Sequence, residues 1–127
     1  MAWRLAKSLE KLREQINAAH PQRSKASDGS IGDQAHAARA SDHNPDEHGV
    51  VAAIDITNDP SGGVDGHTLS RALTGDPRAK YVIFHGEIWK ARTGQWEAYH
   101  GANAHNHHVH ISVKPDIYDN VEPWPSV

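Results

Sequence analysis

The sequence contains no cysteine among its 127 residues. This absence excludes disulfide bonds, thiolate nucleophiles and sulfur-ligated metal sites, so any metal site must use nitrogen and oxygen ligands. The sequence also lacks an apolar run of the roughly 18 residues that a membrane-spanning helix needs. Its N-terminal stretch, MAWRLAKSLEKLREQI, has no continuous apolar core like that of a signal peptide. We expect no transmembrane segment and no secretion signal, so action outside the cytoplasm would need another route of release.

A large excess of charge of one sign is absent as well. Thirteen basic and 16 acidic side chains give a net charge of −3, without a long block of like charges. This balance argues against a protein that binds nucleic acid or membrane surfaces by electrostatics. With 37% hydrophobic residues, a chain of this length can bury one modest core, so we expect a single domain over residues 1–127.

Apolar residues at helical spacing predict two helices. The first, within residues 2–20, is marked by four apolar side chains with that period: Leu5, Leu9, Leu12 and Ile16. Pro21 ends this pattern. Leu69 and Leu73 lie four residues apart and indicate a second helix within residues 64–75.

Three other segments are typical of strands. GVVAAIDIT, residues 49–57, is rich in β-branched residues. KYVIFHGEIWKA, residues 80–91, predicts a hairpin about His85 and Gly86, and HHVHISVK, residues 107–114, predicts a last strand before a Pro-rich tail. The sum is an α+β domain in which helices pack on one side of a small, mostly antiparallel sheet.

Polar side chains alternate with apolar ones on two of these strands. Because alternate side chains share a face, His108 and His110 point away from the core that their apolar neighbours enter. By the same alternation, Asp55 lies opposite its flanking isoleucines. A solvated sheet face explains any one of these residues. Their coincidence, together with His43 in the preceding SDHNP loop, indicates a shared site.

Two histidines and a carboxylate, with a fourth position left to water, form a catalytic zinc site rather than a closed structural one. Zinc also suits a chain without cysteine, although the same ligands bind other divalent ions. Zinc lowers the pKa of a bound water to about 7 and polarises a carbonyl group.

SDHNPDEHGVVAAIDIT together with HHVHISV resembles the zinc peptidases of the D-Ala-D-Ala carboxypeptidase and hedgehog-like superfamily, in particular small phage endolysin-type members. Such proteins typically carry S-x-H, a downstream G-x-x-A-x-D and a late H-x-H. The stretches RSKASDGSIGDQAH and YVIFHGEIW also look like that phage-type group, so the resemblance covers most of the sequence.

The resemblance implies a hedgehog or DD-peptidase-like fold and a zinc cofactor. It implies His43, Asp55 and His110 as zinc ligands, and His108 as the catalytic residue beside the attacking water. It also implies hydrolysis of a peptide bond in the peptidoglycan stem peptide or crossbridge by a monomeric lysin, held in the host cytoplasm until it reaches the cell wall. Endopeptidase and carboxypeptidase activity would both need this same set of residues.

The spacing of the first ligand departs from the common motif, which has six residues between His and Asp. His43 and Asp55 have eleven between them, whereas His48 and Asp55 have six. The Ser41 to His43 match favours His43, with His48 in a turn exposed to solvent. A loop of this composition can present either imidazole to a metal.

Three upstream residues are candidates for supporting roles. Arg23 resembles the arginine that such enzymes use near the substrate, where a guanidinium pairs with a stem-peptide carboxylate. Taken alone, Arg23 is explained more simply as a surface residue. Asp33 and His36 are candidates for orienting the zinc ligands, although Asp33 is equally explained as a helix cap.

Two alternatives stay open from the sequence. A zinc-containing module of the same fold could bind cell wall without cleaving it. A His-metal nuclease is also suggested by HNHH and DHNP, but it would need the basic patch that this chain lacks. Among the tryptophans, Trp3 and Trp89 are expected to pack in the core, and Trp96 and Trp124 are candidates for lining a groove.

Overall fold

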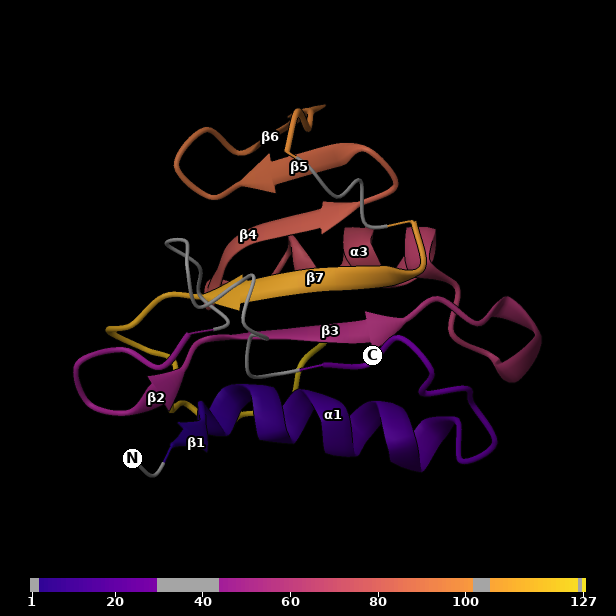
Figure 1. The fold of residues 1–127 in the computed structure, drawn as a ribbon, viewed down its shortest axis with the longest axis horizontal. Coiled ribbons are helices and arrows are strands. Elements are labelled where there is room, and N and C mark those ends of the chain that lie inside the picture. Colours follow the sequence, from indigo (N-terminus) through magenta and orange to yellow (C-terminus); the bar gives the residue numbers. More distant parts are fainter. Residues whose placement is uncertain (1–2, 30–43, 102–105, 126) are drawn as a thin grey trace.

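A five-stranded antiparallel sheet forms the centre of the protein (Figure 1). The structure is a computed structural model that describes residues 3–29, 44–101, 106–125 and 127. Across the sheet the strands follow the order β3 (Ala53–Thr57), β7 (His108–Val113), β4 (Ala79–Phe84), β5 (Glu87–Lys90) and β6 (Gln95–Ala98). A separate parallel pair joins β1 (Arg4–Leu5) to β2 (Val50–Val51).

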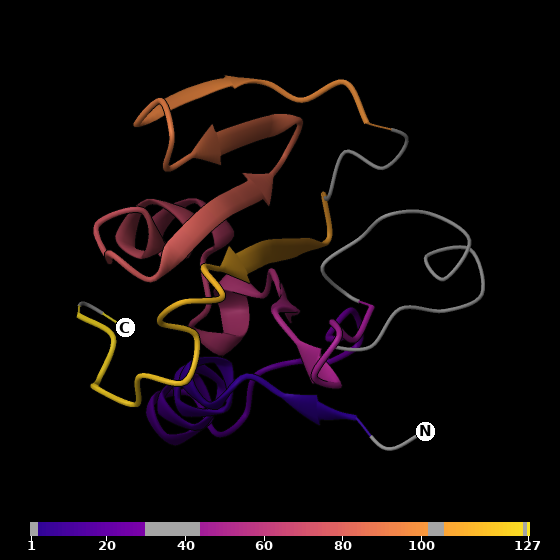
Figure 2. The same ribbon diagram turned by 90° about the vertical axis from the view of Figure 1, so that its left-hand side faces the viewer.

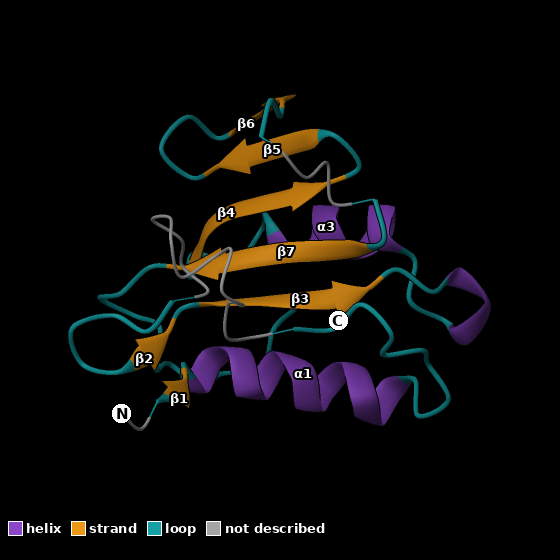
Figure 3. Ribbon diagram, viewed as in Figure 1, coloured by secondary structure: helices purple, strands orange, loops and turns teal. Residues whose placement is uncertain are grey.

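Two α-helices of the described residues, α1 (Lys7–Ala19) and α3 (Gly66–Leu73), pack on the same face of this sheet (Figures 2 and 3). The first contacts β3, and the second contacts β4 and β7. A short 3-10 helix, η1 (Pro60–Gly62), follows β3. The predicted α+β class, with helices on one side of an antiparallel sheet, is confirmed. No helix in the described ranges is long and apolar enough to cross a membrane.

The core forms where one face of the sheet meets the apolar stripes of both helices. Alternate sheet residues supply one half of it: Ile54, Ile56, Val82, Val109, Ile111 and Val113. The helices supply the other half: Leu9, Leu12, Ile16, Leu69 and Leu73. Burying each of these side chains stabilises the fold by about 1.5–3 kcal/mol. Because side chains alternate along a strand, this packing places Asp55, His108 and His110 on the opposite face.

Two predicted segments are divided differently in the structure. The first helix begins at Lys7, because the two residues of β1 pair with β2 instead of continuing the helix. The single strand predicted over residues 49–57 is two strands, because β2 pairs with β1 whereas β3 pairs with β7. Strand β6 was not predicted, and three of its four residues are exposed.

The predicted hairpin between β4 and β5 is confirmed. His85 and Gly86 form its turn, with φ angles of 52° and 78°. Positive φ at both central residues defines a type I′ turn, whose twist matches that of the flanking strands. Glycine adopts this conformation without strain, which is why it suits the second position.

The tryptophan expectations are only partly correct. Trp124 is not a groove residue: it is 2% exposed, and its Nε1–H donates to the Ser8 carbonyl. Trp3 is not in the core, since 41% of it is exposed. Trp89 and Trp96 both pack against the core from the hairpin that β5 and β6 form. Because Trp124 bonds to Ser8 in α1, the C-terminal tail packs on the helix side of the fold.

Candidate functional site

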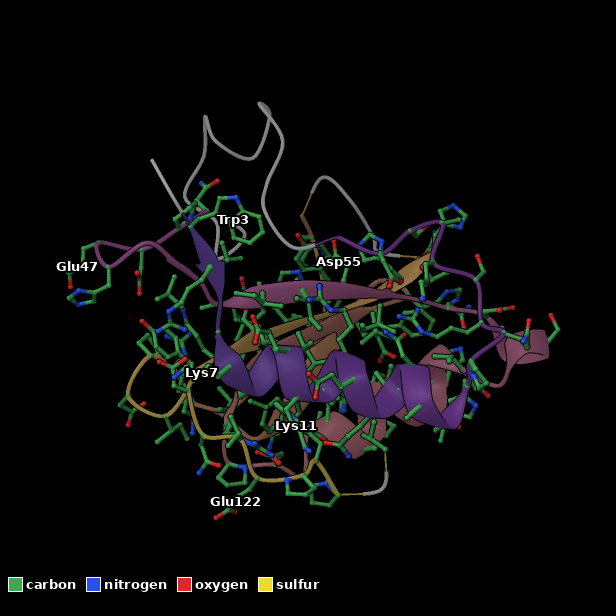
Figure 4. The ribbon with its side chains drawn as sticks, turned by 90° about the horizontal axis from the view of Figure 1, so that it is seen from below. Trp3, Lys7, Lys11, Glu47, Asp55 and Glu122 are labelled. Carbon is green, nitrogen blue, oxygen red and sulfur yellow. The ribbon has the colours of Figure 1, made fainter. Side chains whose placement is uncertain are left out.

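The antiparallel register of β3 and β7 sets Asp55 directly opposite His110. Asp55 Oδ1 lies 3.2 Å from His110 Nδ1. His108, two residues earlier on the same face of β7, places its Nε2 3.5 Å from Asp55 Oδ2. One carboxylate thus lies between the two imidazoles of the H-x-H motif. Figure 4 shows Asp55 on the side of β3 that faces away from α1.

These three side chains are largely removed from solvent. The exposed fraction is 4% for the His110 side chain, 16% for Asp55 and 15% for His108. A carboxylate removed from water is costly unless it is paired, hydrogen-bonded or bound to a metal. A solvated sheet face, the simple explanation of the sequence pattern, does not describe these residues.

His110 is held in place by two neighbours to which the sequence assigned no role. Ser112 Oγ lies 2.9 Å from His110 Nε2, and Ser112 is fully buried. The Tyr81 ring stacks on the imidazole, with centroids 5.2 Å apart and planes 11° from parallel. Ser112 follows His110 at strand spacing, so alternation alone places it on the same face. Tyr81 comes from β4, and only the strand register brings it to the site.

The outer edge of β3 is bound by the segment that contains Arg23. Gly29 exchanges two backbone hydrogen bonds with Asp55, and Asp28 Oδ1 accepts from the Thr57 backbone N–H and hydroxyl. Arg23 makes a two-pronged ion pair with Asp28 at 3.1 and 2.8 Å. Its Nε–H also donates to Asn17. Arg23 therefore holds residues 23–29 beside the site.

Arg23 is not the surface arginine of the simpler interpretation, because its side chain is fully buried. Burial acts to raise the pKa of Asp28, but hydrogen bonds from Arg23 and Thr57 outweigh it, so the pKa of Asp28 lies below its ordinary value. All three guanidinium nitrogens of Arg23 already donate within the protein. Its role toward a substrate stays a prediction.

The other predicted residues divide between the described and undescribed ranges. His43, Asp33 and His36 lie outside the described residues. His48 lies in an exposed turn, as expected, with its side chain 73% exposed and its Nε2 3.6 Å from Glu47. Glu47 lies at the outer end of this turn, well away from Asp55 (Figure 4).

Asp46 fixes the turn that carries His48. Its Oδ1 accepts hydrogen bonds from the backbone N–H groups of His48 and Val50, and its Oδ2 accepts from the Tyr118 hydroxyl. Burial acts to raise the pKa of Asp46, but these hydrogen bonds outweigh it and lower the pKa below its ordinary value. The turn is thus anchored to β2 and to the C-terminal tail.

The spacing of Asp55 and His110 fits two ligands of one zinc ion. With zinc bonds of about 2.0–2.2 Å, two ligand atoms of a tetrahedral site lie about 3.3 Å apart. The 3.2 Å between Oδ1 and Nδ1 matches this value, as it also matches a direct hydrogen bond. Within the described residues, no group of three or more His, Asp or Glu side chains is arranged to hold a metal ion. A third protein ligand would have to come from outside those residues.

Comparison with known proteins adds no assignment. No family model, no curated protein and no solved structure matches this chain. The site geometry and the motif resemblance are therefore the two supports for a function.

Proposed function

We propose that this protein is a zinc-dependent peptidoglycan peptidase with a hedgehog or DD-peptidase-like fold, and that it acts as a phage-type lysin. The observation that carries the proposal is the cross-strand pairing of Asp55 and His110, with His108 beside them on the same protected face. The S-x-H and H-x-H motifs, with Asp55 at the end of GVVAAID, predicted this set, and the register brings its described members together.

Two described residues would hold the zinc ion. Asp55 offers Oδ1 and His110 offers Nδ1. In the tautomer that leaves Nδ1 unprotonated, His110 Nε2–H donates to Ser112 Oγ. This hydrogen bond and the Tyr81 stack fix the imidazole plane, as partners of metal-ligating histidines commonly do. By the motif match, His43 would be the third ligand.

When bound, zinc would polarise the scissile carbonyl and make water nucleophilic at neutral pH. His108 would accept the proton that this water loses and deliver it to the departing amine. Hydroxyl adds to the carbonyl carbon, the C–N bond breaks, and the water proton ends on the new amino group. Asp55 Oδ2, 3.5 Å from His108 Nε2, stabilises the protonated imidazole between these two transfers.

The proposal is tested by amino-group release from purified peptidoglycan, with mass spectrometry of the soluble fragments. The zinc-loaded protein is compared with the same protein after chelation and after zinc is added back. We expect release that chelation abolishes and zinc restores, and the fragment masses will name the bond. If the zinc-loaded protein binds peptidoglycan but releases no amino groups above the chelated control, it is a binding module and not a peptidase.

A further inference from the structure

A cleft of about 590 Å³ lies on the sheet next to the candidate site. Its lining residues come from β4 and β5 and from the segments that directly follow β5 and β7. The side chains that matter for its chemistry are Lys80, Tyr81, Ile88, Lys90, Arg92 and Lys114. Two are apolar or aromatic and four are cationic.

The cleft shares a sheet face with His110. Tyr81 pairs with Ser112 across one strand boundary and with Lys90 across the other, so all three side chains point to the same face. The Tyr81 ring also stacks on His110. Tyr81 is therefore the shared wall of the candidate site and the cleft, and a ligand can contact both.

A β-bulge adds a lysine to this cleft. The register of β4 against β7 shifts between Ala79 and Tyr81, which leaves Lys80 as the extra residue. A bulge redirects a side chain that would otherwise alternate to the other face. Lys80 and Tyr81 consequently both line the cleft, with Lys80 Nζ 5.7 Å from the centre of the Tyr81 ring.

The charge of the cleft opposes the charge of the protein. Four of the 13 basic residues line it, although the net charge is −3. Lys90 is paired with Glu97 at 2.7 Å, and none of the described lining residues is acidic. A cationic rim over a floor of Tyr81 and Ile88 suits an extended peptide that carries carboxylates and small apolar side chains.

We propose that this cleft binds the free carboxylates of the stem peptide beside the scissile bond. The inference rests on the proposed function and gives its site a substrate-recognition surface. Arg92 and Lys114 would each make a charge-assisted hydrogen bond to a carboxylate, while the peptide backbone runs over Tyr81 toward His110. Recognition then depends on the carboxylates of the peptide.

The test measures binding by isothermal titration calorimetry, separately from hydrolysis. The probes are a synthetic stem tetrapeptide with free carboxylates and the same peptide with every carboxylate converted to an amide. The proteins are wild type, the double variant Arg92→Gln/Lys114→Gln and the matched control Lys11→Gln. Lys11 lies on α1, on the far side of β3 from Asp55 (Figure 4).

We expect amidation to weaken binding to wild type about tenfold or more, since each lost charge-assisted contact carries about that factor. The double variant should bind both peptides alike and weakly, and Lys11→Gln should behave as wild type. Equal affinity of wild type for the two peptides, unchanged affinity in the double variant, or no binding of the free-acid peptide at millimolar concentration would each overturn the proposal.

Hydrolysis of the same two peptides distinguishes this inference from the proposed function. Carboxylate-dependent binding without cleavage leaves the cleft assignment intact and removes the peptidase assignment. Cleavage of both peptides with equal KM leaves the peptidase assignment intact and removes the cleft assignment. The thermal unfolding midpoint of the double variant checks that its fold is retained.

Discussion

His110 and Asp55 face each other across the β7–β3 boundary, with Nδ1 3.2 Å from Oδ1. The apolar pattern of both strands sets this register. If either strand shifted by one residue against the other, its isoleucine and valine side chains would move from the core face to the opposite face. The hydrophobic core of the protein therefore also aligns the two candidate zinc ligands. This coupling leads to predictions about metal binding and about stability.

Removing either member of the pair should remove most of the zinc affinity. We expect His110→Ala and Asp55→Asn each to lower the affinity by more than about 100-fold, because one of few protein ligands is lost. Competition with a chromophoric chelator measures this. His100→Ala, at an exposed histidine without motif context, is the control. Wild-type affinity in Asp55→Asn would show that the pair is only a hydrogen bond.

His43 and His48 should differ as ligands. His48 is held in an exposed turn beside Glu47, so His48→Ala should bind zinc as wild type does. His43→Ala should lose affinity to the same extent as His110→Ala. The same chelator competition decides between them. If His48→Ala loses zinc affinity and His43→Ala does not, His48 is the ligand, and this chain follows the six-residue spacing of the common motif.

Ser112→Ala should weaken zinc binding without changing the ligands. Ser112 Oγ is 2.9 Å from His110 Nε2, and losing such a partner typically costs 10–100-fold in metal affinity. Ser70→Ala is a matched control, since Ser70 is also fully buried but bonds to the His67 carbonyl in α3. Equal affinity of the two variants would remove Ser112 from the site.

Asp28→Asn should destabilise the protein at neutral pH and much less in acid. The carboxylate pairs with the buried guanidinium of Arg23, and leaving that charge unpaired costs about 3 kcal/mol. Because the folded-state pKa of Asp28 is below 3.8, its stabilisation is present above pH 3.8 and is lost as the pH falls through the folded value.

Urea unfolding of wild type and Asp28→Asn between pH 7 and pH 2 checks this sign. The difference in unfolding free energy should be largest at pH 7 and should shrink below about pH 4. Asp116→Asn, at an exposed position, should follow wild type throughout. A difference that grows with acidity would contradict the assigned ion pair.

Trp124→Ala should lower the unfolding free energy by about 3–5 kcal/mol, as expected for loss of a large buried aromatic side chain. Trp3→Ala, at a residue 41% exposed, should cost far less. Thermal and urea unfolding measure both. If the two variants unfold alike, Trp124 does not belong to the core.

Local periodicity predicted the elements but not their partners. Alternation was enough to place Asp55, His108 and His110 on polar strand faces. It did not indicate that Asp55 faces His110, because β3 and β7 are far apart in the chain and their register is set by the folded core. Tyr81 was missed for the same reason.

Composition also misled at two positions. Trp124 lies in the Pro-rich tail and was predicted as a candidate groove residue, whereas its ring packs against Arg78 and its indole N–H bonds to α1. The simpler interpretation of Arg23 as a surface residue is wrong because nothing in the local sequence indicates that Asp28 folds back onto it. Both errors concern contacts between segments, which a local pattern does not encode.

The most direct test of the account is the rate of amino-group release from peptidoglycan by zinc-loaded His108→Ala, beside wild type and His100→Ala. We predict a loss of at least about 100-fold in His108→Ala with zinc still bound, because general acid–base catalysis contributes that much, and no loss in His100→Ala. Release by His108→Ala at the wild-type rate would contradict the assigned mechanism.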